Sequence, residues 1–240
     1  MTTLTFECEK CKDTGWVEVE EITTQCGITT KGVRRCECVE VKRCKKILED
    51  SGIAEAFRSK TIKDYITKNE QQLTAKQMCV DYIRGYKDIS QLSENSIAFL
   101  GQVGAGKSHL TIAVGNALLK SGIGVVYMQY REAVTQLKQL ITEEEDFQKM
   151  LNRYKNATVL IIDDLFKGML RNGRANESDL NIMFDLINYR YLKKSPVLVS
   201  SEYKLRDLVG FDEAIGSRIG EMCKGRIVEF VGQELNHRMR

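Results

Sequence analysis

The chain has 240 residues, a size that allows one α/β domain with a small additional unit and excludes two large domains. Hydrophobic residues make up 42% and charged residues 29% of it, and no apolar run reaches the roughly 18 residues needed to cross a bilayer. We therefore expect a globular protein with no membrane partner. The net charge is only +3, because 36 lysines and arginines oppose 33 carboxylates, so any basic surface for nucleic acid must be local.

The amino-terminal stretch is rich in cysteine. Six of the eight cysteines lie before residue 50, which marks residues 1–50 as a separate unit. The first residues show no basic stretch followed by an apolar one, so we expect no secretory signal and a cytoplasmic protein. Thiols are reduced in that compartment, and clustered cysteines there indicate a metal rather than a disulfide framework.

Two pairs of these cysteines have the spacing of metal ligands. The expected ligands are Cys8, Cys11, Cys36 and Cys38. Four sulfurs suit tetrahedral zinc, whose binding would supply folding energy to a unit of about 50 residues. The second pair is separated by one residue, which is tighter than usual, so Cys26 or Cys44 remains an alternative ligand. A reduced cluster without metal is the alternative to the whole site.

The rest of the chain changes character twice. Residues 51–95 predict a linker, a helix between Leu73 and Tyr86, and a polar loop. After them, apolar runs of strand length alternate with amphipathic stretches. The runs lie at 97–100, 125–129, 158–162, 196–200 and 226–230. This alternation predicts an α/β domain over residues 96–240, with a parallel sheet covered by helices on both faces.

The first of these strands leads into Gly101-Gln-Val-Gly-Ala-Gly-Lys-Ser108, which fits the phosphate-loop pattern G-x-x-x-x-G-K-[ST]. Glycines let the backbone wrap around a polyphosphate, and the following helix adds partial positive charge at its amino terminus. Lys107 is expected to reach the β and γ phosphates of ATP, and Ser108 to hold Mg²⁺. The residues expected at the nucleotide are Gly101, Gly104, Ala105, Gly106, Lys107, Ser108 and His109, of which His109 packs or caps rather than catalyses.

The strand at 158–162 ends in two carboxylates, Asp163 and Asp164, at the sheet edge where ligands of such folds bind. We expect Asp163 to coordinate magnesium through water and Asp164 to orient or deprotonate the attacking water. Capping of the next element is the alternative for Asp164. Paired acids favour ATP hydrolysis over binding alone, and a small-molecule kinase would in addition need a basic lid and an acceptor pocket, which the sequence does not indicate.

Together with Cys8-Glu-Lys-Cys11, Asn188-Tyr-Arg-Tyr191 and Gly216-Ser-Arg-Ile219, these motifs resemble the DnaC and DnaI helicase loaders and the IstB-like transposition ATPases of the AAA+ class. The resemblance implies a P-loop NTPase with a five-stranded parallel sheet in the order 5-1-4-3-2. It also implies a ring or spiral of subunits in which Arg218 reaches the ATP of the next subunit as an arginine finger. Pairing with Glu221 is the alternative for Arg218.

A polar residue at the end of the fourth strand senses the γ-phosphate in such ATPases, and Ser201 and Glu202 are the candidates here. The loaders usually have an asparagine at this point, so Glu202 is a departure. A carboxylate there would repel the phosphate unless it turns toward water, magnesium or a cation. The departure bears on the rate of hydrolysis more than on binding.

The resemblance further implies a replicative helicase and single-stranded DNA as partners. We expect the zinc unit, with the basic stretch 31–46, to dock the helicase, and the alternatives are a DNA contact and a solvated charged face. Lys167, Arg171 and Arg174 are the candidates for contacting DNA, and a solvent loop is the alternative for them. Arg190 is expected on a solvated helix face. The resulting hypothesis is an ATP-dependent helicase loader, serving a phage or mobile element as readily as a host, and the alternatives are a transposition helper and an ATP-binding adaptor that hydrolyses little.

Overall fold

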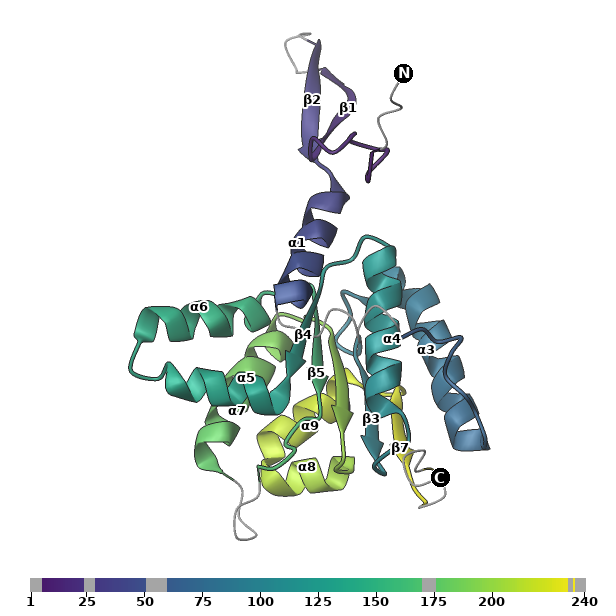
Figure 1. Cartoon of the computed structure of the whole chain (residues 1–240), viewed down its shortest axis with the longest axis vertical. Coiled ribbons are helices and arrows are strands. Elements are labelled where there is room, and N and C mark those ends of the chain that lie inside the picture. Colours follow the sequence, from purple (N-terminus) through teal and green to yellow (C-terminus); the bar gives the residue numbers. More distant parts are fainter. Residues whose placement is uncertain (1–5, 24–28, 51–59, 170–175, 233–234, 236–240) are drawn as a thin grey trace.

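A computed structural model describes residues 6–23, 29–50, 60–169, 176–232 and 235, and the predicted sheet is present in it (Figure 1). Its strand order is β4-β5-β6-β3-β7, and the paired strands are all parallel. Numbered along the α/β domain, this is the predicted order 5-1-4-3-2. Each strand also lies within one residue of its predicted position. The predicted fold class is therefore confirmed.

The elements of this domain alternate as the apolar pattern indicated. The strands are β3 (Ile97–Gly101), β4 (Val125–Gln129), β5 (Val159–Asp163), β6 (Val197–Ser201) and β7 (Ile227–Phe230). The helices are α3 (Glu70–Ile89), α4 (Lys107–Lys120), α5 (Tyr130–Gln139), α6 (Glu144–Lys155), α7 (Glu177–Leu192), α8 (Leu205–Phe211) and α9 (Glu213–Met222). Among the described residues, no helix combines the length and the hydrophobicity that crossing a bilayer requires.

Both faces of the sheet are buried, which explains why its strands are apolar at consecutive positions. Side chains alternate between the faces of a strand. In β3, Ile97 and Phe99 belong to the core that α3 and α4 cover, whereas Ala98 and Leu100 belong to the core that α5, α6, α7, α8 and α9 cover. The result is three layers, with the sheet between two sets of helices (Figure 1).

The position of β6 brings three functional strand ends together. Because β6 lies between β3 and β5, the phosphate loop after β3 and the acidic pair after β5 are separated by one strand. The strands are parallel, so their carboxyl ends meet at one edge of the sheet. The end of β6, with Ser201 and Glu202, lies between the loop and the acids.

The cysteine-rich unit stands apart from this domain. It consists of an antiparallel hairpin, β1 (Trp16–Thr23) and β2 (Thr29–Arg35), followed by α1 (Glu37–Asp50). The hairpin lies at one end of the long axis of the molecule, and α1 runs from it to the sheet, where it contacts β4 (Figure 1). The domain boundaries predicted at residues 50 and 95 stay predictions.

Arg190 corrects the expectation of a solvated helix face. Its side chain is fully buried, and its guanidinium donates to four backbone carbonyls at 2.7–3.0 Å. These acceptors are Tyr154, Lys155, Ala157 and Pro196. Burial lowers the pKa of this guanidinium to about 10. The helical periodicity did not predict this role because the acceptors are carbonyls at the end of α6 and just before β6, which only the tertiary fold brings to α7.

Candidate functional site

The loop between β3 and α4 has the backbone that the phosphate-binding pattern requires. Gly101, Gly104 and Gly106 have φ values of 92°, 77° and 88°, a region that favours glycine. A Cβ at Gly106 would lie 2.6 Å from the Tyr65 ring, so no larger residue fits there. Gly106 precedes α4 without a side-chain cap, which leaves the first amides of the helix for another acceptor. This cradle fits a polyphosphate.

Lys107 lies at the centre of the cradle. Its side chain is buried, and its Nζ donates to the carbonyl oxygens of Gly101 and Gln102, both at 2.8 Å. Burial lowers the pKa of this lysine to about 8, and the neighbouring Glu202 and Asp164 partly oppose that shift. An anion in the cradle would favour the protonated form.

The first acid of the pair, Asp163, is held by two hydroxyl groups. Tyr127 donates to Oδ2 at 2.7 Å, and Ser200 donates to Oδ1. Burial raises the pKa of the Tyr127 hydroxyl, and the charge of Asp163 adds to that shift. The same Ser200 oxygen accepts from the backbone amide of Asp164 at 2.9 Å. Ser200 therefore fixes both acids, a role that the sequence analysis missed because small hydroxyl residues in a buried strand give no distinct signal.

Asp164 and the phosphate loop border one cavity of about 420 Å³. Its lining residues are Lys60, Asp64, Tyr65, Ile66, Val103, Gly104, Gly106, Lys107, Ser108, His109, Asp164, Lys167 and Glu202. The predicted nucleotide residues Lys107, Ser108 and His109 are thus brought together with Asp164 and Glu202. Ala105, within the loop, and Asp163, which precedes Asp164, are buried and are not among the lining residues.

One wall of this cavity comes from the segment that the sequence analysis assigned to a linker. Tyr65 donates its hydroxyl hydrogen to the carbonyl oxygen of Ala105 at 2.8 Å, so it packs directly on the phosphate loop. The ring of His109 lies edge-on to Tyr65, and its Nε2 is 2.7 Å from the carbonyl oxygen of Thr61. His109 therefore packs against neighbouring residues, as expected. The flat, partly apolar wall is suited to a nucleobase.

Glu202 turns toward a cation, one of the three arrangements that would relieve its repulsion of a phosphate. Its Oε1 lies 2.8 Å from the Nζ of Lys167, and the same Nζ donates to Asp164 Oδ2 at 2.9 Å. Lys167 was predicted to contact DNA, but its ammonium lies in this cavity. Arg171 and Arg174, predicted for the same role, lie outside the described residues.

Ser201 is placed away from the cavity. Its hydroxyl is fully buried, donates to the carbonyl oxygen of Leu165 at 2.8 Å and accepts from the amide of Tyr203. These contacts fix the turn after β5 to the end of β6. Of the two sensor candidates, only Glu202 borders the cavity.

Arg218 lies on α9 and packs against α7. It donates to the side chain of Asn188 at 3.1 Å and to the carbonyl oxygen of Ala214 at 2.8 Å, and its guanidinium lies over the rings of Phe184 and Tyr191. It is not among the residues that line the cavity. The alternative partner of Arg218, Glu221, instead accepts a hydrogen bond from Tyr191.

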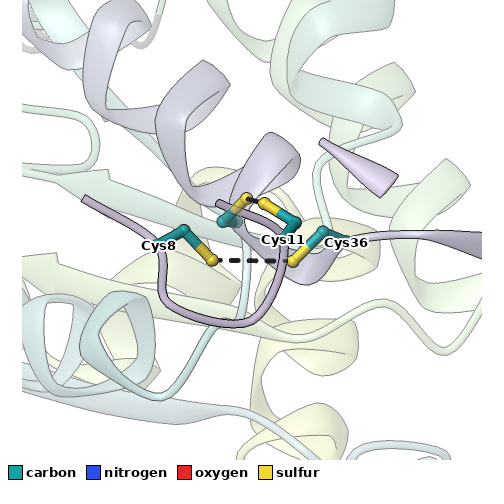
Figure 2. Close-up of side chains that lie close together, drawn as sticks. Cys8, Cys11 and Cys36 are labelled. Carbon is teal, nitrogen blue, oxygen red and sulfur yellow. Dashed lines mark hydrogen bonds between the residues drawn. The ribbon is translucent and has the colours of Figure 1, made fainter. Parts of the chain in front are cut away.

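The four predicted zinc ligands converge (Figure 2). Their Sγ atoms all lie within 4.8 Å of one another, with 3.7 Å between Cys8 and Cys36 and 3.4 Å between Cys11 and Cys38. Tetrahedral zinc with bonds of about 2.3 Å places its sulfurs about 3.8 Å apart, so the donor set fits that ion. Cys26 lies outside the described residues, and nothing is described of the Cys44 side chain.

Cys8 and Cys11 lie on a turn that the side chain of Asp13 stabilises. Asp13 accepts from the amides of Glu7 and Cys8, and it pairs with Lys42 of α1 at 2.8 Å. A backbone hydrogen bond at Cys11 lowers the pKa of the Cys8 thiol to about 7. The Asp13–Lys42 pair therefore ties this turn to α1.

Known proteins match this chain along most of its length. The sequence profile of the family described as "IstB-like ATP binding protein" matches residues 39–210. The phage-like element PBSX protein XkdC of Bacillus subtilis is 38% identical over 242 residues, covering 98% of this chain and 86% of XkdC. A putative ATP-binding protein of insertion sequence IS232 from Bacillus thuringiensis subsp. berliner is 29% identical, covering 66% of this chain and 61% of that protein.

Solved structures share the fold. The crystal structure of the DnaC helicase loader matches with a TM-score of 0.64 and 24% identity, covering 74% of this chain and all (100%) of that one. The crystal structure of DnaI matches with a TM-score of 0.57 and 18% identity, covering 74% of this chain and 90% of that one. At these identities the likeness concerns the AAA+ fold alone.

Proposed function

The chain belongs to the family of IstB-like ATP binding proteins, and we propose that it is an ATPase that loads a replicative helicase onto single-stranded DNA. One observation carries the ATPase part: the phosphate cradle, Lys107 and the carboxylate of Asp164 border the same cavity. A cradle alone would support binding, whereas an acid at the phosphate end supports hydrolysis. Such a role would place the protein in the cytoplasm.

In this proposal Lys107, Ser108, Asp163 and Asp164 have separate tasks. Lys107 and the amides at the start of α4 bind the phosphates, and Ser108 with Asp163 would hold Mg²⁺. The ion would supply charge neutralisation of the phosphates when bound. Asp164 orients the attacking water, and the hydroxyl groups of Tyr127 and Ser200 keep Asp163 in place beside it.

Arg218 would complete the site of a neighbouring subunit in a ring or spiral. The contacts of Arg218 with Asn188 and two aromatic rings hold its guanidinium against α7, and it is not among the residues that line the cavity of its own subunit. A guanidinium that acts in trans stabilises transition-state charge only after assembly, which links hydrolysis to oligomer formation.

The zinc unit, residues 1–50, would dock the helicase, and residues 51–95 would connect it to the ATPase domain. Support comes from the four converging thiols and from the position of the hairpin at one end of the molecule, clear of the ATPase core (Figure 1). A structural zinc ion would keep this small unit folded while its surface contacts a partner.

A transposition helper is the second candidate function, because the matching family and the IS232 relative point to it. Such a protein would present DNA to a transposase with the same ATPase core. Binding of the full chain to a purified replicative helicase, compared with binding to a transposase, separates the two. An adaptor with little hydrolysis is a third reading, which Glu202 supports, and a steady-state ATPase assay tests it.

Mixing two inactive variants tests the shared ATPase site. We expect Lys107→Ala, Asp164→Asn and Arg218→Ala each to abolish DNA-stimulated ATPase activity, and Ser217→Ala, an exposed neighbour on α9, to retain it. An equal mixture of Asp164→Asn and Arg218→Ala should recover about a quarter of wild-type activity, because one junction in four joins an intact acid to an intact arginine. No recovery, with both variants folded, would remove the shared site from the proposal.

A further inference from the structure

Lys167 joins two strand ends at the phosphate end of the cavity. Its Nζ contacts Asp164, which follows β5, and Glu202, which follows β6, at 2.9 and 2.8 Å. The three side chains are only partly exposed, at 37%, 22% and 27%. All three line the cavity that contains Lys107. This lysine therefore belongs to the nucleotide site and not to an outer surface.

The backbone around Lys167 fixes its position. Asp164 and Phe166 have positive φ values of 55° and 63°, which non-glycine residues adopt only where their surroundings impose them. The Phe166 ring is fully buried, edge-on to the rings of Tyr130 and Phe211. The amide of Lys167 also donates to the carbonyl oxygen of Asp164 at 3.0 Å. The anchored ring and the tight turn direct the lysine toward the two carboxylates.

The contact of Lys167 with Asp164 and Glu202 affects the balance of charge in the cavity. The cavity is lined by three cations and three carboxylates, namely Lys60, Lys107, Lys167, Asp64, Asp164 and Glu202. At the inner end, Lys107 and Lys167 face Asp164 and Glu202, with the buried Asp163 behind them. Without Lys167, Lys107 would be the one lysine side chain opposing three carboxylates at the end of the cavity where the proposed ATPase function puts the γ-phosphate. Asp164 and Glu202, which line the cavity, would then repel the γ-phosphate directly.

We propose that Lys167 is a positioning residue of the nucleotide site, which neutralises Glu202 and holds Asp164 so that the cavity accepts a γ-phosphate. This inference rests on the proposed ATPase function and deepens it. Hydrogen bonds that involve charged groups are worth about 10- to 100-fold in an equilibrium. In this proposal the γ-phosphate is the group that lies beside the carboxylates and a diphosphate ends short of them, so the lysine would make the site discriminate between ATP and ADP.

Binding of a non-hydrolysable ATP analogue and of ADP, both with Mg²⁺, tests the proposal by titration calorimetry on the full chain. Lys167→Met should weaken binding of the analogue at least about tenfold and binding of ADP less than about threefold. Adding Glu202→Gln to that variant should restore part of the lost affinity, because one of the two repelling charges is then gone. Lys224→Met is the matched control: Lys224 also pairs with a carboxylate, Glu94, but at the surface, and its affinities should equal those of the wild type.

The outcomes separate the two proposals. If the wild type binds the analogue and Lys107→Ala does not, but Lys167→Met binds like the wild type, the role of Lys167 is wrong and the ATPase proposal stands. Equal losses for the analogue and ADP, with no recovery in the double variant, also overturn it. If Lys167→Met does not fold, Lys167→Arg and the double variant decide: Lys167→Arg should bind the analogue nearly as well as the wild type, whereas the double variant should bind it more weakly than the wild type, and a double variant that binds like the wild type overturns the proposal. A wild type that binds neither nucleotide overturns both proposals. If Lys167→Met binds nucleotides normally but no longer binds DNA, Lys167 is a DNA contact and the proposal for it is wrong.

Discussion

Raising the pH should weaken nucleotide binding through Lys107. Burial lowers the pKa of its ammonium group to about 8, well below the ordinary value of 10.5. The groups that face it are Asp163, Asp164, Glu202 and Lys167, of which the three carboxylates favour the charged form and the lysine opposes it. A bound triphosphate adds negative charge beside the ammonium and raises its pKa further, so the protonated protein is the form that binds.

The size of the effect follows from the fraction of protonated lysine. With a pKa of about 8, about 90% of Lys107 is protonated at pH 7 and about 10% at pH 9. Affinity for ATP should therefore fall about tenfold across this window, provided that the pKa in the complex lies above 9. The effect on stability has the opposite sign. Between pH 8 and 10.5 the unfolded chain binds more protons at this group than the folded chain, so its contribution to stability rises with pH.

Calorimetric titration of the wild type with ATP and Mg²⁺ at pH 7, 8 and 9, at constant ionic strength, measures the predicted slope. The phosphates stay ionised across this range, since their last pKa lies near 6. Binding at pH 8 should also take up protons, which is seen as a dependence of the heat on the buffer used. Lys107→Met serves as the control and should bind weakly at every pH with little slope. A flat affinity for the wild type between pH 7 and 9 would refute the reasoning.

Two further predictions concern stability. Arg190→Met should lower the free energy of unfolding by about 3 kcal/mol or more, because four carbonyls lose a buried donor. Urea denaturation measures this change. As a control, substitution of the exposed Lys193 (Lys193→Met) should leave the free energy of unfolding within about 0.5 kcal/mol of the wild-type value. The purified chain should contain one zinc ion by elemental analysis, and Cys8→Ser with Cys11→Ser should remove it and unfold the hairpin while nucleotide binding persists; a stoichiometry near zero in a folded wild type would contradict this.

The fold was predictable because its signals are local. Strands buried on both faces are apolar without interruption, and the phosphate loop requires glycine at fixed positions, so both leave a clear pattern in the sequence. Asp163 and Asp164 were predicted for the same reason, since Asp163 ends the apolar strand β5 and Asp164 follows it, and their roles stay predictions. The strand order, in contrast, came from the resemblance, because nothing local specifies that β6 lies between β3 and β5.

The contacts that complete the site were hidden because they join segments far apart in the chain. Tyr65 and Ala105 are 40 residues apart, and Ser200 and Asp163 are 37 residues apart. Tyr65 lies outside a regular helix or strand, so no periodicity marks it as a wall of the cavity. The burial of Arg190 was not predicted for a related reason. Its place on α7 is compatible with a buried or a solvated position, and the carbonyls at the end of α6 and just before β6 decide between the two.

Lys167 and Glu202 show how two residues that look independent in the sequence can form one feature of the structure. From the sequence, Glu202 is an unfavourable charge beside a phosphate, and Lys167 is one of several basic residues in a glycine-containing stretch. In the structure, the cation that Glu202 needs is Lys167, and the same cation also holds Asp164. A neutral asparagine at position 202 would repel no phosphate and would need no lysine. The pair is therefore best understood as a unit, in which the lysine makes the glutamate tolerable and the two strand ends are joined where the γ-phosphate would bind.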